Sequence, residues 1–258
     1  MSKLIVSVQE DDHERLSAIQ SALGPVTIPI LRRNKKSSRI EVCSTGFCLK
    51  VCENLYVITA SHSIDDLSAQ SDWEYLLGVD GKTTIIPRIF RPNEREGASS
   101  LDIAAIPISR ESEFFEDFER FAIPIGSAMY RKEFSDIDIQ FVQGFVKNIN
   151  KSPKNYDSEN MNLVANVFGY AQPFEKSVDF SHYEKDSRFH YAIKWVDRVN
   201  GNKVMSPAGL SGAGYWFFPD QYNIDRKFLA GVFIEYHKKD SVAFVTKIDH
   251  VINLIENI

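Results

Sequence analysis

Three short segments of this 258-residue chain carry side chains that could together perform nucleophilic chemistry. His62 follows an apolar run in YVITASHS, Asp102 opens the apolar run LDIAAIPI, and Ser211 stands among small residues in PAGLSGAGYW. A serine hydroxyl is a weak nucleophile at neutral pH, so it needs an adjacent base that a third group orients. Taken singly, such residues are ordinarily structural. The interpretation as a catalytic set depends on the order of the three residues along the chain and on the segments around them.

The order of the three residues along the chain narrows the class of enzyme to which they could belong. His, then Asp, then Ser is the order of chymotrypsin-like peptidases, whereas subtilisin-like and α/β-hydrolase enzymes use other orders. His62 and Asp102 fall in the first half of the chain and Ser211 in the second. A cleft between two halves would therefore bring them together.

The elements that must position these residues are predicted to be mainly strands. Period-two alternation and short apolar runs predict strands at 26–31, 39–43, 46–52, 55–60, 83–90, 101–108, 137–146, 162–170, 188–196, 215–218, 228–236 and 242–248. Helical spacing of Leu16, Ile19 and Leu23 predicts a helix over 8–23, and 249–258 is also helical in pattern. We expect an all-β fold of two antiparallel six-stranded barrels with an N-terminal and a C-terminal helix. The expected parts are a helical extension over 1–25, a first barrel over 26–120 and a second over 121–258.

These segments resemble those of the trypsin-like, chymotrypsin-fold serine peptidases over roughly residues 26–258. ITASH resembles the family's strand followed by Ala-x-His, and LDIAAI resembles its Asp-Ile-Ala block. GLSGAG resembles its Gly-x-Ser-Gly-Gly block, with Ala213 replacing the last glycine. The strand LAGVFIEY, which contains Ile234, resembles the one that lines the family's substrate cleft.

The resemblance implies a role for each matched residue. Ser211 would be the nucleophile, His62 its base and later the acid, and Asp102 the group that holds the His62 tautomer. The backbone N–H groups of Gly209 and Ser211 would form the oxyanion hole. The substrate would be a protein or peptide, and the family needs neither a metal nor an organic cofactor.

Two departures from the family affect activation and specificity. Residue 210 is Leu where secreted members carry Asp, and no activation-cleavage block precedes the first strands, so the site is either preformed or ordered by an activating partner or ligand. By rough alignment Met205 stands at the base of the primary specificity pocket, with Tyr236 and Ala243 on its wall. We therefore expect the substrate to carry an apolar or small residue just before the scissile bond. The alternative is that His190 or His237 binds an acidic substrate residue at that position.

Composition excludes several other classes of protein. Hydrophobic residues make up 43% and charged residues 25%, as in ordinary globular chains. A net charge of −5 argues against nucleic-acid binding. We expect neither a signal peptide nor a membrane span, and an odd cluster of three cysteines (Cys43, Cys48 and Cys52) favours a reducing compartment, hence the cytoplasm. With His62 this cluster resembles a zinc site only loosely, and buried apolar packing is the simpler interpretation.

Two rival functions stay open at this point. An α/β-hydrolase would need glycine at position 213 and an acid and a histidine after the serine. A catalytically inactive or latent family member could act as a protein-binding module, since a fold does not guarantee a function. The favoured hypothesis is a cytoplasmic serine endopeptidase that makes limited cuts in a particular protein.

Overall fold

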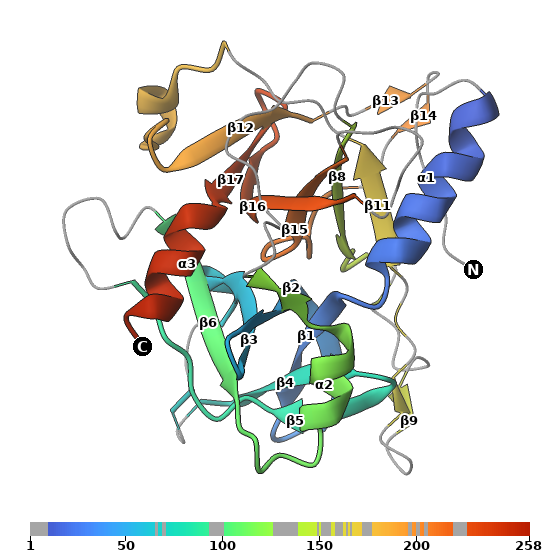
Figure 1. Cartoon of the computed structure of the whole chain (residues 1–258). Coiled ribbons are helices and arrows are strands. Elements are labelled where there is room, and N and C mark those ends of the chain that lie inside the picture. The colour runs from blue at the N-terminus through green and yellow to red at the C-terminus, as the bar shows by residue number, and fades with distance from the viewer. Residues whose placement is uncertain are drawn as a thin grey trace.

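The computed structural model describes residues 10–64, 67–68, 71–92, 101–125, 139–148, 150, 156–157, 162–163, 165, 167–171, 177–195, 198–199, 202–203, 206–218 and 226–258. Strands dominate this part of the chain and form two large antiparallel sheets, one below the other in Figure 1, with three α-helices beside them. The structure is therefore mostly β, as the sequence predicts.

The first sheet contains the strands that precede His62 and follow Asp102. Its strand order is β5-β4-β1-β2-β3-β6, and the short β7 pairs with β2 in parallel. The strands are β1 (Thr27–Asn34), β2 (Ile40–Val51), β3 (Asn54–Ala60), β4 (Trp73–Val79), β5 (Lys82–Ile85), β6 (Ile103–Ile108) and β7 (Ile123–Pro124). Phe90, which follows β5, bridges to Ala105 in β6, so the two edges of this sheet approach each other.

The second sheet carries the strand that begins after Ser211. Its order is β11-β8-β15-β16-β17-β12. The strands are β8 (Ile139–Phe145), β11 (Val167–Ala171), β12 (His190–Lys194), β15 (Gly214–Phe218), β16 (Phe228–His237) and β17 (Val242–Lys247). Two small hairpins are separate from it, β9 (Tyr156–Asp157) with β10 (Asn162–Leu163) and β13 (Arg198–Val199) with β14 (Asn202–Lys203).

The two large sheets share most of their strand pairings, although the sequence shows no internal repeat. When the six main strands of each sheet are numbered in chain order, the first pairs with the second and the fourth in both sheets. The fourth also pairs with the fifth, and the third with the sixth, in both. A common topology can persist without sequence similarity because it depends on strand order and not on residue identity.

The hydrophobic core joins both sheets and includes the first helix. α1 (Glu10–Leu23) buries Leu16, Ile19 and Leu23 against residues of both sheets, and Gln20 donates to the Val167 carbonyl of β11 at 3.1 Å. Figure 1 accordingly shows α1 lying against the second sheet. The helix predicted at 8–23 is thus an integral part of the core.

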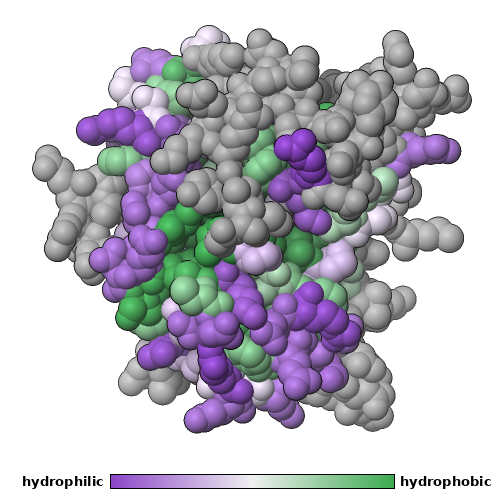
Figure 2. Space-filling model, viewed as in Figure 1, coloured by the Kyte–Doolittle hydropathy of each residue, from purple (hydrophilic) through white to green (hydrophobic). Residues whose placement is uncertain are grey.

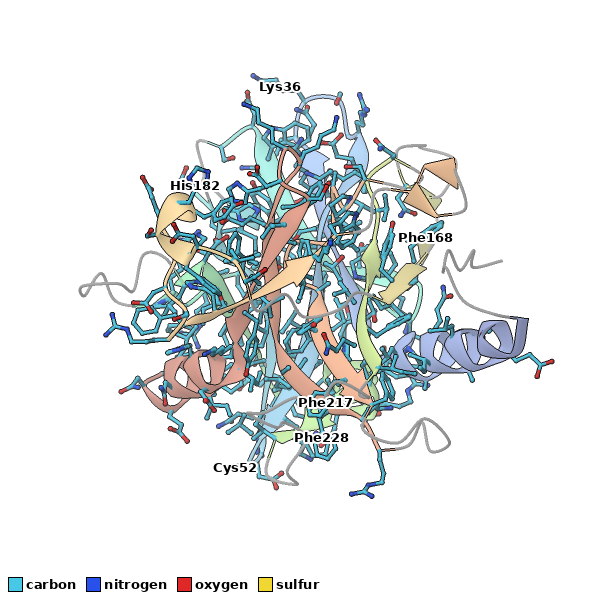
Figure 3. The ribbon with its side chains drawn as sticks, turned by 90° about the horizontal axis from the view of Figure 1, so that it is seen from above. Lys36, Cys52, Phe168, His182, Phe217 and Phe228 are labelled. Atoms are coloured by element: carbon cyan, nitrogen blue, oxygen red, sulfur yellow. The ribbon has the colours of Figure 1, made fainter. Side chains whose placement is uncertain are left out.

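The other two helices pack against strands of the sheets. α2 (Phe115–Phe121) contacts β2, and α3 (Ile248–Glu256) contacts β6 and β16. In Figure 2 hydrophobic surface is visible over α3, where Ile252 and Leu254 are only partly covered. In the second sheet, Phe217 and Phe228 stack with ring centroids 5.0 Å apart, and Figure 3 shows them together.

Several strand boundaries differ from the prediction. The segments 39–43 and 46–52 form one continuous strand, β2, because Ser44 and Thr45 remain extended and paired with β1. β4 was not predicted, and only the beginning of 83–90 is in a strand. The first sheet also continues past residue 120, through β7. None of the helices in the described part of the chain combines the length and apolarity needed to cross a membrane.

Candidate active site

The three residues singled out in the sequence meet where the two sheets face each other. His62 Nδ1 lies 2.5 Å from Asp102 Oδ2, and His62 Nε2 lies 3.2 Å from Ser211 Oγ. A carboxylate only accepts hydrogen bonds, so Nδ1 carries the proton and Nε2 has a lone pair for the serine hydroxyl. The histidine side chain is 51% exposed and the aspartate side chain 19%. The hydrogen-bonded series from Asp102 through His62 to Ser211 is therefore accessible to solvent mainly at the histidine.

The turn after β3 sets the position of His62. Ser61–Ser63 form a single 3₁₀ turn at the end of this buried strand. Arg91 spans the turn, because its Nε donates to Ser61 Oγ at 2.7 Å and its Nη2 donates to the Ile64 carbonyl at 2.5 Å. One guanidinium therefore holds both ends of the segment that carries the histidine.

Asp102 is fixed by its backbone as well as by its side chain. Its φ is +48°, a left-handed conformation that Asp and Asn tolerate better than most residues. Its carbonyl accepts the Ser61 N–H at 3.0 Å, and its Oδ1 accepts the His62 N–H at 2.9 Å. Both carboxylate oxygens thus point to the histidine, one to its backbone and one to its ring.

Two successive turns present Ser211. The Leu210 N–H donates to the Pro207 carbonyl and the Ala213 N–H to the Leu210 carbonyl, each at 2.8 Å. The third residue of each turn is a glycine with positive φ, +102° at Gly209 and +87° at Gly212, as type II turns require. Ser211 occupies the second position of the second turn, at the point where the chain reverses toward β15.

Close packing also demands glycine at those two positions. A Cβ on Gly209 would lie 2.3 Å from the Phe145 carbonyl oxygen, and one on Gly212 would lie 2.0 Å from the Thr45 carbonyl oxygen. Leu210, between them, is fully buried in the core of the second sheet. A buried apolar side chain therefore occupies the position at which secreted members of the peptidase family that this sequence resembles carry Asp.

The amides near the serine are available to a ligand. In the part of the chain that the structure describes, neither the Gly209 N–H nor the Ser211 N–H donates to a protein oxygen. The Ala208 carbonyl accepts the Lys147 N–H at 2.8 Å. In a trans peptide the C=O and N–H point in opposite directions, so this bond directs the Gly209 N–H away from the Lys147 backbone. The arrangement could polarise a carbonyl placed next to Ser211 Oγ.

The residues predicted to bind substrate have different environments. Met205 lies outside the described residues. Ile234 and Ala243 are fully buried, whereas Tyr236 is half-buried, with its ring centroid 5.7 Å from that of Trp195. Of the described three, only Tyr236 has appreciable exposed surface.

The two histidines considered for recognition of an acidic substrate residue both have polar partners within the protein. His190 is buried in β12, and its Nδ1 donates to the Asp186 carbonyl at 3.0 Å. His237 Nε2 lies 3.1 Å from Glu235 Oε1, and Lys185 Nζ lies 3.1 Å from the same oxygen.

The cysteine cluster is spread over one hairpin of the first sheet. Cys43 and Cys48 are buried in β2, and burial raises the pKa of each thiol to about 12. Cys52 is exposed in the turn that follows, at the edge of the molecule in Figure 3. Across the described residues, no group of three His, Cys, Asp or Glu side chains is arranged to hold a metal ion.

Sequence reasoning missed the residues that hold the candidate site in place. Arg91, Ser44 and Thr45 belong to segments with no chemical motif, and their partners are distant in the chain. Arg91 lies 30 residues after Ser61, the residue whose side chain it contacts, and no local pattern links the two. Thr45 lies 164 residues before Gly209, the residue it contacts, and nothing in a single sequence pairs them.

No model of a known family matches the chain, and no curated protein matches it with significant sequence similarity.

Proposed function

We propose that this chain is a trypsin-like serine endopeptidase that cleaves peptide bonds through an acyl-enzyme intermediate. The observation that carries the proposal is the hydrogen-bonded series from Asp102 Oδ2 through the His62 ring to Ser211 Oγ, with contacts of 2.5 and 3.2 Å. A nucleophile bonded to a base that a carboxylate orients is the arrangement that such catalysis needs.

The proposed fold is two six-stranded antiparallel barrels, with His62 and Asp102 on the first and Ser211 on the second. The pairing scheme common to both sheets supports this arrangement. The bridge between Phe90 and Ala105 supports closure of the first barrel, since it joins the segment after one edge strand to the other edge strand.

In the proposed first half-reaction, Ser211 Oγ attacks the scissile carbonyl and its proton moves to His62 Nε2. The Asp102 carboxylate stabilises the imidazolium that forms. The N–H groups of Gly209 and Ser211 donate to the oxyanion of the tetrahedral intermediate, and one such donor is typically worth about 10²–10³ in turnover. The intermediate collapses as Nε2 passes its proton to the leaving amine, and the acyl group remains on Ser211.

In the second half-reaction, water replaces the amine. His62 Nε2 removes a proton from the water, the resulting hydroxide attacks the acyl carbonyl, and the same two amides hold the oxyanion. Nε2 then returns the proton to Ser211 Oγ, which releases the carboxylic acid and restores the resting site. The protein's own groups suffice for every step.

We further propose that the enzyme is cytoplasmic and makes limited cuts in a particular protein. The three cysteines are free thiols, as is usual in a reducing compartment. With methionine aligned at the base of the pocket, we propose an apolar or small residue before the scissile bond.

Digestion of a diverse set of synthetic peptides, with products identified by mass, tests this function. Wild-type protein should release fragments with a common preference at the cleaved bond, and Ser211→Ala should release none. Absence of cleavage by both proteins would contradict the proposal and would favour an inactive, protein-binding member of this fold.

A further inference from the structure

The loop that carries Ser211 is held from the first sheet by a side chain with no part in the proposed proton relay. Thr45 of β2 is fully buried, and its hydroxyl donates to the Gly209 carbonyl at 2.8 Å. The same hydroxyl accepts the Phe145 N–H of β8 at 2.9 Å. A hydroxyl has a single proton, so each of these bonds has only one possible direction.

The backbone of Thr45 holds the other side of the same loop. Its N–H donates to the Ser211 carbonyl at 2.9 Å, and the Ser44 hydroxyl donates to that carbonyl as well. The Thr45 carbonyl in turn accepts the Thr59 hydroxyl at 2.8 Å. One residue of the first sheet therefore binds the loop on both sides of Leu210.

The Gly209 carbonyl is the point at which the hydroxyl acts on the loop between the two oxyanion-hole amides. The peptide before Gly209 is held through its carbonyl by the Lys147 N–H, and the peptide after it is held by the Thr45 hydroxyl. These two bonds fix both torsions of Gly209, whose lack of a Cβ gives it no steric preference of its own. Without the hydroxyl, the Gly209–Leu210 peptide would lose its bond to the first sheet, and the chain that leads from the Gly209 N–H to Ser211 would be less firmly placed.

The surrounding residues are shaped to admit this hydroxyl. A Cβ on Gly144, the residue before Phe145, would lie 2.6 Å from Thr45 Oγ1. Glycine at that position of β8 leaves the space in which the hydroxyl reaches across to the loop.

We propose that Thr45 is a positioning residue whose hydroxyl holds the Gly209–Leu210 peptide, and so keeps Ser211 and the two amides of a preformed oxyanion hole in place relative to one another. The inference rests on the proposed peptidase function. In this inference, a hydrogen bond between the two sheets orders the oxyanion hole, which an activating partner would otherwise have to order.

Thr45→Val tests the inference, because valine keeps the shape and removes the hydroxyl. The readouts are the rate of labelling by a tagged fluorophosphonate and the kcat and KM on a peptide that wild-type protein cleaves. We expect labelling rate and kcat to fall by about 10- to 100-fold, part of the effect of losing an oxyanion donor outright, with KM within about twofold of wild type. Thr45→Ser, which restores the hydroxyl, should recover most of the activity.

Thr83→Val is the matched control. Thr83 is also a buried threonine of the first sheet, and among the described residues its hydroxyl has no hydrogen-bond partner. This variant should label and cleave like wild type. Thr45→Cys, which substitutes a weak donor of similar size, serves if Thr45→Val does not fold, and circular dichroism checks the fold of each variant.

The outcomes separate this inference from the function on which it rests. Wild-type kcat and labelling rate in Thr45→Val, or in a folded Thr45→Cys, would overturn the positioning role and leave the peptidase proposal intact. A fall in activity that Thr45→Ser does not recover would also overturn it. Failure of wild-type protein both to label and to cleave would overturn the function, and the inference with it.

Discussion

Asp102 binds His62 at two places: its Oδ1 accepts the backbone N–H at 2.9 Å, and its Oδ2 lies 2.5 Å from Nδ1 of the ring. The carboxylate thus fixes both the position of the histidine and the tautomer that leaves Nε2 unprotonated. This double contact is the basis of the first prediction.

Asp102→Asn should retain the fold and lose about 10⁴-fold in turnover, because the amide favours the wrong His62 tautomer. Asparagine tolerates the φ of +48° found here, so the backbone should not rearrange. Asp80→Asn, in a turn with φ of +47°, is the control and should keep full activity. Turnover of the Asp102 variant within tenfold of wild type would exclude the assigned role.

Peptide cleavage should be lost on acidification. The base must be neutral to accept the serine proton, and histidine side chains ordinarily change charge between about pH 5 and 8. kcat/KM should therefore rise with pH over this range and level off above it. A flat profile, measured after checking that the protein stays folded at the acidic end, would argue against His62 as the base.

The glycine in the second turn of the serine loop should be far less replaceable than a partly exposed glycine of similar φ. Gly212→Ala combines a left-handed backbone with a Cβ placed 2.0 Å from the Thr45 carbonyl oxygen. A cost of about 2–5 kcal/mol in unfolding free energy is expected from strain and overpacking together. Gly81→Ala, at φ +78° with nothing within 4 Å of the Cβ, should cost only about 1–2 kcal/mol.

Urea titrations of the two alanine variants measure these costs. Equal destabilisation would mean that close approach to β2 does not constrain the serine loop.

Thiol reactivity should separate the three cysteines. Burial raises the pKa of Cys43 and Cys48 to about 12, and the thiolate is the reactive form, so iodoacetamide near neutral pH should modify only the exposed Cys52. Intact mass should show one adduct on native protein, none on native Cys52→Ser and three on denatured wild type. Two or more adducts on the native wild type would contradict the burial of β2.

The sequence predicted the local parts of the site better than the contacts that hold it. His62, Asp102 and Ser211 each stand beside a recognisable apolar or glycine-rich segment, so residue type and order sufficed to select them. The strand β4 was missed because WEYLLGV has little alternation, and its burial depends on pairing with β1. The bond from Thr45 to Gly209 depends on how two sheets face each other, which no local pattern encodes.

The most direct test of the account is fluorophosphonate labelling of wild-type protein beside Ser211→Ala, read by intact mass and by the modified peptide. An assembled relay predicts a single stoichiometric adduct on Ser211 of the wild type and none on the variant. No adduct on the wild type, or an equal adduct on both proteins, would contradict the claim that His62 and Asp102 activate Ser211.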